Sequence, residues 1–241
     1  MEKKEKFYFF HNGKKYEYLI IKSKRKSISI FVEKDKKIVV KAPLYASTTE
    51  IQKLVENKAD WIAKKTEQIN ELQKDKPVHH YISGEIFYYR GKPLTLNLII
   101  NHDRNRIMVR KQADTLLVVS PTAESDVIKS VIIKWYREQA REVLQQKVSY
   151  YQRFIGKSVG DIRIKEQKSR WGSCSSKGNL NFNWKIVMAA DDIIDYLVVH
   201  ELCHRLHMDH SREFWDSVGK IIPDYKTKEK WLKENGARLD L

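Results

Sequence analysis

The sequence predicts an α+β protein in which a β-rich N-terminal part with helices precedes a part built from a β-hairpin and helices. Alternation of apolar and polar residues indicates strands within residues 7–45 and again within residues 87–119. A proline ends each group of strands, Pro43 in the first and Pro121 in the second, and an amphipathic helix follows each time. The last third of the chain contains the hairpin and an almost wholly apolar helix.

The first group of strands contains the clearest local signals. Asp35 and Lys36 separate two alternating segments, residues 27–32 and 37–41, and predict a hairpin there. Ser47 and Glu50 form a capping-box pattern that predicts the start of a helix. Residues 73–77 have the composition of a linker.

Part of this pattern recurs along the chain. The segment Ile38–Pro43 is echoed by Leu116–Pro121, and the helix after each carries a tryptophan, Trp61 or Trp135. The second helix is predicted over residues 125–151. The recurrence suggests an internal duplication. Two copies of so common an arrangement could also arise by coincidence.

The last third is organised differently, and we place a domain boundary near residue 120, giving an N-terminal part, 1–120, and a C-terminal domain, 121–241. In this domain we expect a strand at 162–165, a hairpin formed by 170–175 and 180–187, and helices at about 192–206, from Ser211 to before Pro223, and from Tyr225 to Asn235.

Composition limits the classes of function. The net charge of +15 favours phosphates or nucleic acid as partners, but the lysines are scattered, as on an ordinary solvated surface. No apolar run approaches the ~18 residues of a membrane span, and the N-terminus does not resemble a signal peptide, so we expect a cytoplasmic protein without a membrane partner. Cys174 and Cys203 are expected to be reduced thiols.

The pattern H-E-x-x-H, formed by His200, Glu201 and His204, is the most informative motif. Helical spacing places the two histidines one turn apart on one face, so both imidazoles can reach one ion. Glu201 is offset by about 100°, beside that ion. The surrounding helix is apolar on nearly all sides, which predicts burial, and unpaired polar groups are costly there. A zinc ion with a bound water would satisfy all three side chains. The alternative is a purely structural helix, in which carboxylates or carbonyls satisfy the stacked histidines.

A catalytic zinc ion needs a third protein ligand. His210 follows His204 by six residues, the offset found in H-E-x-x-H-x-x-G-x-x-H, but His207 replaces the glycine. We favour His210 over His207 as the ligand, because His207 would lie about two turns from His200 on a continuing helix.

These residues predict metal-assisted hydrolysis with Glu201 as the general base. Four residues are candidates for stabilising the oxyanion: Arg170, Tyr196, His207 and Tyr225. The strand Leu180–Trp184 is a candidate edge strand that could pair with a peptide, or an ordinary packed hairpin strand.

Several segments together resemble the YgjP-like metallopeptidase family, relatives of the SprT-like zinc proteases. They are residues 171–175 (WGSCS), 183–184, 196–204 (YLVVHELCH), 210–211, 214–215, 223–225 and 231–232, with Ala59–Ile62 in the N-terminal part. The resemblance implies a zincin-like catalytic core, zinc on His200, His204 and His210, and a catalytic Glu201, and it fixes this site better than the substrate. We expect a peptide or protein substrate. Many members have alanine at the position of Cys203.

Three other functions stay open. A nucleotide pyrophosphatase would suit the basic charge and has been suggested within the family, but the chain lacks a phosphate-binding G-x-x-x-x-G-K-[ST] loop. A protease associated with nucleic acid is the second, as among SprT-like proteins. A structural zinc site with Cys203 as fourth ligand is the third, but Cys203 points about 60° from His200 on the helical wheel. Nothing in the sequence indicates the oligomeric state.

Overall fold

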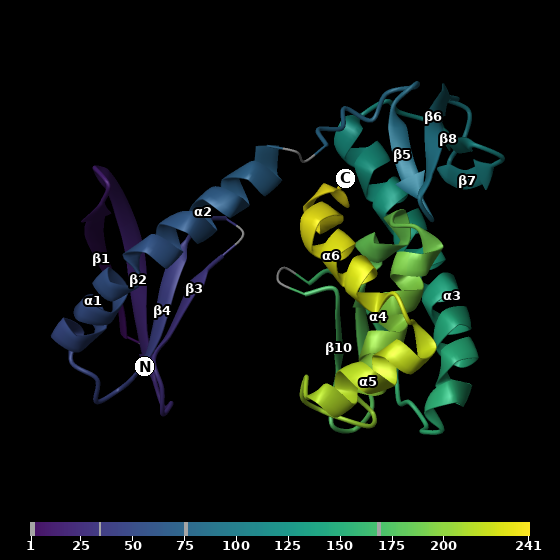
Figure 1. Cartoon of the computed structure of the whole chain (residues 1–241). Helices are drawn as coiled ribbons and strands as arrows, with labels where there is room; N and C mark the ends of the chain where they lie inside the picture. The colour runs from purple at the N-terminus through teal and green to yellow at the C-terminus, as the bar shows by residue number, and fades with distance from the viewer. Residues whose placement is uncertain (1–2, 34, 75–76, 168–169) are drawn as a thin grey trace. The chain divides into compact units, whose positions relative to one another are not determined.

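The computed structural model describes residues 3–33, 35–74, 77–167 and 170–241. The chain divides into two compact units, residues 1–75 and 76–241 (Figure 1). The predicted linker coincides with this division, but Gln73 and Lys74 still belong to a helix, and Asp75 and Lys76 lie outside the described residues.

The first unit is a four-stranded sheet with two helices. Its strands have the order β1-β2-β4-β3, and β2 and β4 are parallel while the outer pairs are antiparallel. The elements are β1 (Lys3–His11), β2 (Lys14–Ser23), β3 (Ser29–Val32), β4 (Ile38–Pro43), α1 (Thr48–Asn57) and α2 (Ala59–Lys74).

Local signals and one buried sheet face account for this unit. The predicted capping box is present, since Ser47 Oγ accepts from the Glu50 amide and the Glu50 carboxylate accepts from the Ser47 amide, both at 3.1 Å. Alternate residues of the strands meet the apolar face of the helices, and the core consists of Phe9, Tyr18, Ile20, Ile38, Val40, Ala42, Ala46, Ile51, Val55, Ala59 and Ile62.

The second unit opens with the same arrangement. Its first sheet has the order β5-β6-β8-β7, again with a parallel central pair and antiparallel outer pairs, and a long helix follows. The elements are β5 (Ile86–Tyr89), β6 (Lys92–Ile100), β7 (Met108–Gln112), β8 (Thr115–Ser120) and α3 (Ser125–Ile155). α3 extends one turn beyond the predicted end and stops at Gly156, whose φ of 67° ends the helix.

The turns repeat as well as the strands. The β1–β2 turn has positive φ at Asn12 (48°) and Gly13 (72°), and the β5–β6 turn has positive φ at Arg90 (52°) and Gly91 (74°). Equivalent strand order, pairing direction and turn conformation are what an internal duplication of a sheet-and-helix element predicts.

The remaining elements form the helical part of the second unit. A three-stranded sheet has the order β10-β11-β9, with β10 antiparallel and β9 parallel to β11. The elements are β9 (Ile162–Lys165), β10 (Gly172–Cys174), β11 (Leu180–Asn183), the 3₁₀ helix η1 (Trp184–Met188), α4 (Asp191–Cys203), α5 (Arg212–Ile221), α6 (Tyr225–Asn235) and the 3₁₀ turn η2 (Gly236–Arg238). The predicted hairpin is confirmed, but residues 184–187 leave it as a 3₁₀ helix.

The division of the chain differs from the boundary expected near residue 120. One continuous core contains Phe87, Leu96 and Val118 of the first sheet together with Phe182 and Val198 of the helical part. α3 contacts η1 and α4, and Figure 1 shows it running along the unit beside α4. The strands of residues 86–120 therefore belong with the C-terminal elements, because their buried face has no separate core.

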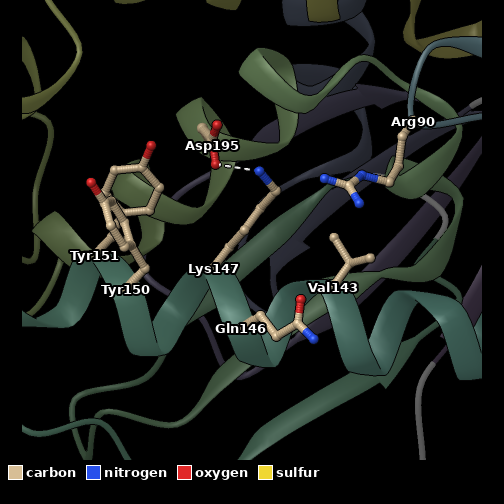
Figure 2. A pocket seen from close by; sticks show the side chains of 7 residues that line it. All are labelled: Arg90, Val143, Gln146, Lys147, Tyr150, Tyr151 and Asp195. Carbon is tan, nitrogen blue, oxygen red and sulfur yellow. Dashed lines mark hydrogen bonds and ion pairs between the residues drawn. The ribbon is translucent and has the colours of Figure 1, made fainter.

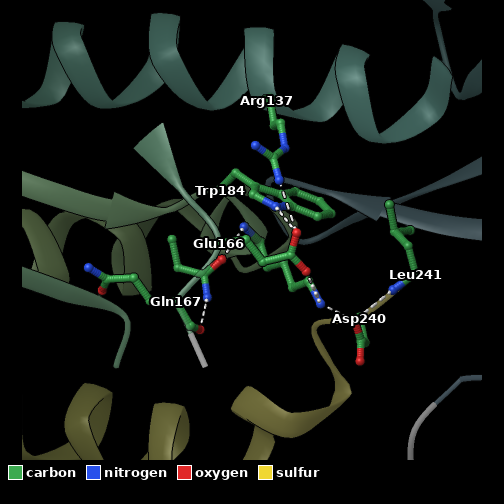
Figure 3. Close-up of polar contacts among 8 residues, drawn as sticks. Arg137, Glu166, Gln167, Trp184, Asp240 and Leu241 are labelled. Carbon is green, nitrogen blue, oxygen red and sulfur yellow. Dashed lines mark hydrogen bonds and ion pairs between the residues drawn. The ribbon is translucent and has the colours of Figure 1, made fainter. Parts of the chain in front are cut away.

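A polar cluster fixes η1 and the C-terminus against this core (Figure 3). The Glu166 carboxylate accepts from Arg137 Nη2 at 3.0 Å and from Trp184 Nε1 at 3.4 Å. Lys185 bridges the same carboxylate, at 3.4 Å, and Asp240. These contacts hold the chain segment that leads into α4.

Among the described residues, none of the helices has both the length and the apolar character to cross a bilayer.

We predict that Gly91→Ala destabilises the second unit by about 2–5 kcal/mol, because positive φ disfavours a side chain and overpacking adds to that cost. A Cβ at residue 91 would lie 2.8 Å from Ala190 Cβ, at the entrance to α4. Gly84→Ala is the matched control, with φ +94° and open space around it. Urea denaturation should show a clearly larger loss for Gly91→Ala, and equal losses would contradict the close contact.

Candidate metal centre

α4 is buried on nearly all sides, as its apolar sequence predicts. Ile194, Val198, Val199 and Leu202 are fully buried, and Glu201 is only 4% exposed. The helix begins directly after the contact between Gly91 and Ala190, and Asp191 in its first turn pairs with Arg90 at 2.7 Å. The core thus determines which α4 side chains can reach the surface.

The three predicted histidines converge at the end of this helix. One ring nitrogen from each of His200, His204 and His210 lies within 4.8 Å of the others. His200 Nε2 and His210 Nε2 are 3.2 Å apart, and the three ring centroids are separated by 4.8–5.1 Å.

After α4 the chain turns back and brings His210 to the site, although His207 stands where the longer H-E-x-x-H-x-x-G-x-x-H motif has glycine. α4 ends at Cys203, three residues before the predicted end at Leu206, and His204 is its C-cap. The Cys203 carbonyl then accepts from the amides of Leu206 (2.9 Å) and His207 (3.0 Å), which tightens the last turn. A loop over residues 207–209 brings His210 beside the other two rings.

His207 contributes its backbone to the site. Its carbonyl oxygen lies 3.1 Å from His204 Nδ1. Because a carbonyl can only accept, Nδ1 of His204 carries the proton and Nε2 keeps its lone pair. This is the orienting contact that metal-binding histidines usually have, and sequence spacing alone gave no sign of it.

Two aromatic residues of α5 form a wall that the sequence reasoning missed. The Phe214 ring stacks on His204 with centroids 4.5 Å apart, and the Trp215 centroid lies 5.6 Å from that of His200 and 5.7 Å from that of His210. Ser211 caps α5 by accepting from the Phe214 amide at 3.4 Å. Residues 214–215 were among the segments of the family resemblance, and they follow a capping serine, but neither signal assigned the rings a role at the metal centre.

Glu201 lies beneath strand β10. A Cβ added at Gly172 would lie 2.4 Å from Glu201 Oε1, so only glycine lets the strand pass this close to the carboxylate. Burial raises the pKa of Glu201 to about 8, and the positive charge of Arg170 partly opposes that increase. In the described part of the chain, Glu201 Oε2 has no hydrogen-bond partner.

Burial also changes the pKa values of two of the histidines, His200 and His204. Desolvation, together with smaller contributions from the neighbouring His204 and His210, lowers the pKa of His200 to about 3. Burial also lowers the pKa of His204. Neutral imidazoles that point at one position, beside an unpartnered buried carboxylate oxygen, suit a divalent metal ion that accepts nitrogen ligands.

The strand suggested as a peptide-binding edge is the wrong one. β11 is the central strand of its sheet, since β10 pairs with one edge and β9 with the other. Trp184 is fully buried in η1. β10 and β9 are the two edge strands of this sheet, and β10 is the one that contacts Glu201.

The four candidates for oxyanion stabilisation have different surroundings. Arg170 is exposed and acts on Glu201 through its charge. Tyr196 is buried with its ring edge toward His200, and desolvation raises its pKa above the usual value. Tyr225 stacks on Trp215 with centroids 5.1 Å apart. Arg170 and Tyr196 are thus the two candidates that interact electrostatically with Glu201.

Both cysteines are free thiols, as expected. Cys203 is fully buried in the apolar core, which raises its pKa to about 12. Such a thiol stays protonated, so Cys203 does not suit a fourth metal ligand.

A hollow of about 430 Å³ lies elsewhere on the second unit (Figure 2). It is lined by Arg90, Val143, Gln146, Lys147, Tyr150, Tyr151 and Asp195. Its cations are already paired, Lys147 with Asp195 at 2.6 Å and Arg90 with Asp191 at 2.7 Å. None of the predicted site residues lines it.

We predict that the metal-free protein loses stability as the pH rises from about 7.5 through the pKa of Glu201. In this window the unfolded histidines have already lost their protons, so His200 and His204 are neutral in both states, whereas Glu201, with its pKa raised to about 8, keeps a proton that the unfolded chain releases. The folded state binds more protons, so stability decreases as pH rises. Urea denaturation with a chelator should show this slope, and Glu201→Gln should reduce it. An unchanged slope in the variant would show that Glu201 is not the group responsible.

Comparison with known proteins gives one family match. The family model described as YgjP-like, metallopeptidase domain, matches residues 26–235. Among solved structures, the metallopeptidase zymogen of Pyrococcus abyssi abylysin is similar over 38% of this chain and 93% of its own, with 20% identity and a TM-score of 0.35. No curated protein gives a significant match.

The family match extends over most of both units and includes the three histidines and Glu201. The chain therefore belongs to the YgjP-like metallopeptidase family.

Proposed function

We propose that this chain is a zinc peptidase in which His200, His204 and His210 hold the metal. The convergence of three imidazole nitrogens within 4.8 Å, next to a buried glutamate, carries the proposal. Three protein ligands leave one position open, which is the arrangement of catalytic zinc, whereas structural zinc usually has four protein ligands.

Bound zinc would lower the pKa of a water molecule and polarise the scissile carbonyl. A nearby cation also favours the ionised form of Glu201, which burial alone disfavours. We assign proton transfer to Glu201 Oε2, the oxygen without a partner among the described groups. It accepts a proton from the attacking water and delivers it to the nitrogen of the leaving amine.

The edge strand β10 suggests how a peptide would be oriented. An extended substrate can pair with a free strand edge through backbone hydrogen bonds, which makes recognition largely independent of side chains. Because Gly172 of β10 lies against Glu201, a peptide on this edge would have its backbone close to the general base. An unfolded protein such as casein is therefore a suitable first substrate.

We expect His204→Ala to lose zinc and His207→Ala to retain it. The first removes a ligand, while the second keeps the backbone carbonyl that orients His204. Metal analysis after dialysis against limiting chelator measures this directly. Loss of zinc from both variants to the same extent would contradict the assignment of His210 as the third ligand in preference to His207.

We expect Glu201→Gln to bind zinc as the unaltered protein does and to lose about 10²–10⁴-fold in kcat/KM, the usual contribution of general base catalysis. Casein cleavage by the zinc-loaded proteins is the assay. A zinc-loaded Glu201→Gln protein with near-normal cleavage would refute the proposed role.

The same preparations should be incubated with nucleoside triphosphates. Phosphate release that depends on Glu201, without casein cleavage, would assign the site to nucleotide hydrolysis instead of peptide hydrolysis.

A further inference from the structure

The first unit has an uncovered sheet face with exposed aromatic rings. Both helices pack on the opposite face, through Ile51, Val55, Ala59 and Ile62 (Figure 1). On the free face, Tyr8 and Phe10 of β1 are 60% and 68% exposed, and Phe31 of β3 is 45% exposed. Large exposed rings gathered on one face usually mark a binding surface.

Strand register connects these rings across the sheet. Lys6 of β1 pairs with Leu19, Leu19 with Val39, and Val39 with Phe31, so an apolar row of the last three residues runs from β2, next to β1, to the opposite edge. The rings of Tyr8 and Phe10 lie 5.8 Å apart on β1. The face therefore has exposed aromatic rings on both outer strands, β1 and β3, and apolar side chains between them.

Lysine side chains accompany the rings. Lys15 Nζ lies 4.6 Å from the centre of the Tyr8 ring, and Lys41 Nζ lies 5.5 Å from that of Phe31. Glu17, on the same face, is paired with Lys15 at 3.3 Å. Each edge thus has a cation next to an aromatic ring.

A basic hollow of about 430 Å³ lies at the end of the sheet where both hairpins turn, on the side toward α2, and it meets the free face at Lys15 and Glu17. Its lining is Lys14, Lys15, Tyr16, Glu17, Asp35, Lys36, Lys37, Ile38, Thr66 and Asn70. Asp35 pairs with Lys37 at 2.6 Å, but no carboxylate of a described residue pairs with Lys14 or Lys36. Lys15 belongs to both the hollow and the face.

The charge of the whole unit agrees with an anionic partner. Residues 1–75 contain 18 lysines and arginines and 11 acidic residues, so this unit, less than a third of the chain, carries +7 of the net +15. A field of this sign attracts polyanions at long range.

We propose that this face binds single-stranded nucleic acid, with bases stacked on Tyr8, Phe10 and Phe31 and phosphates near the lysines of the hollow. Stacking of bases on sheet aromatics combined with lysine contacts to the backbone is a general mode of single-strand recognition. A duplex does not offer unstacked bases to the rings. An acidic polypeptide would satisfy the lysines but has no need of three exposed rings.

The test uses full-length protein and fluorescence anisotropy of a labelled oligothymidylate of about 16 nucleotides. Tyr8→Ala and Phe31→Ala should each weaken binding about tenfold or more, since a stacked base contributes about 1–3 kcal/mol. Tyr8→Phe, which keeps the ring, should bind nearly as the unaltered protein does. Trp61→Ala is the matched control, because Trp61 is also 45% exposed but lies on α2, in the helical layer.

The lysines are tested by the dependence on salt. Lys14→Ala and Lys36→Ala should weaken binding and make the plot of log affinity against log salt concentration less steep, by about 0.7 for each lost phosphate contact. Polyglutamate should compete poorly.

Three results would overturn the proposal: no binding at low salt, equal weakening by Trp61→Ala and Phe31→Ala, or competition by polyglutamate as strong as that by unlabelled oligothymidylate. The zinc content and casein cleavage of these variants should not change. Failure here is thus distinct from failure of the proposed peptidase function.

Discussion

The burial of imidazole and carboxylate groups at the end of α4 is the constraint on which the site depends. Desolvation lowers the pKa of His200 and raises that of Glu201, and the described structure offers no partner to Glu201 Oε2. Polar groups in such surroundings cost several kcal/mol unless something satisfies them. A divalent cation coordinated by three neutral imidazoles offsets that cost and restores the charge of the carboxylate that has to accept a proton.

The surrounding elements hold this arrangement in place from several directions. The β5–β6 turn closes on Ala190 at the start of α4, β10 passes over Glu201 at Gly172, and α5 places Phe214 against His204. Each contact is between rigid elements, which is how a catalytic site keeps its geometry. The first sheet of the second unit therefore supports the site directly, whereas its topological equivalent in the first unit has a free face that is available for other contacts.

Features determined by local spacing were predictable from the sequence. The capping box at Ser47, the hairpins, the buried α4 and the convergence of the histidines all follow from short-range patterns. Features determined by long-range packing were not. The order of the strands, which makes β10 and not β11 the edge, and the shared core that joins residues 86–120 to the C-terminal elements depend on contacts between distant segments. The carbonyl of His207 could not be foreseen either, because its position depends on how the last turn of α4 closes.

X-ray absorption spectroscopy at the zinc edge is the most direct measurement of the metal centre. For protein loaded with one equivalent of zinc, we predict a first shell of nitrogen and oxygen at about 2.0–2.1 Å, with outer-shell scattering from three imidazoles. A sulfur ligand at about 2.3 Å would place a cysteine, Cys174 or Cys203, on the metal. That result, or a shell with fewer than three imidazoles, would contradict the account.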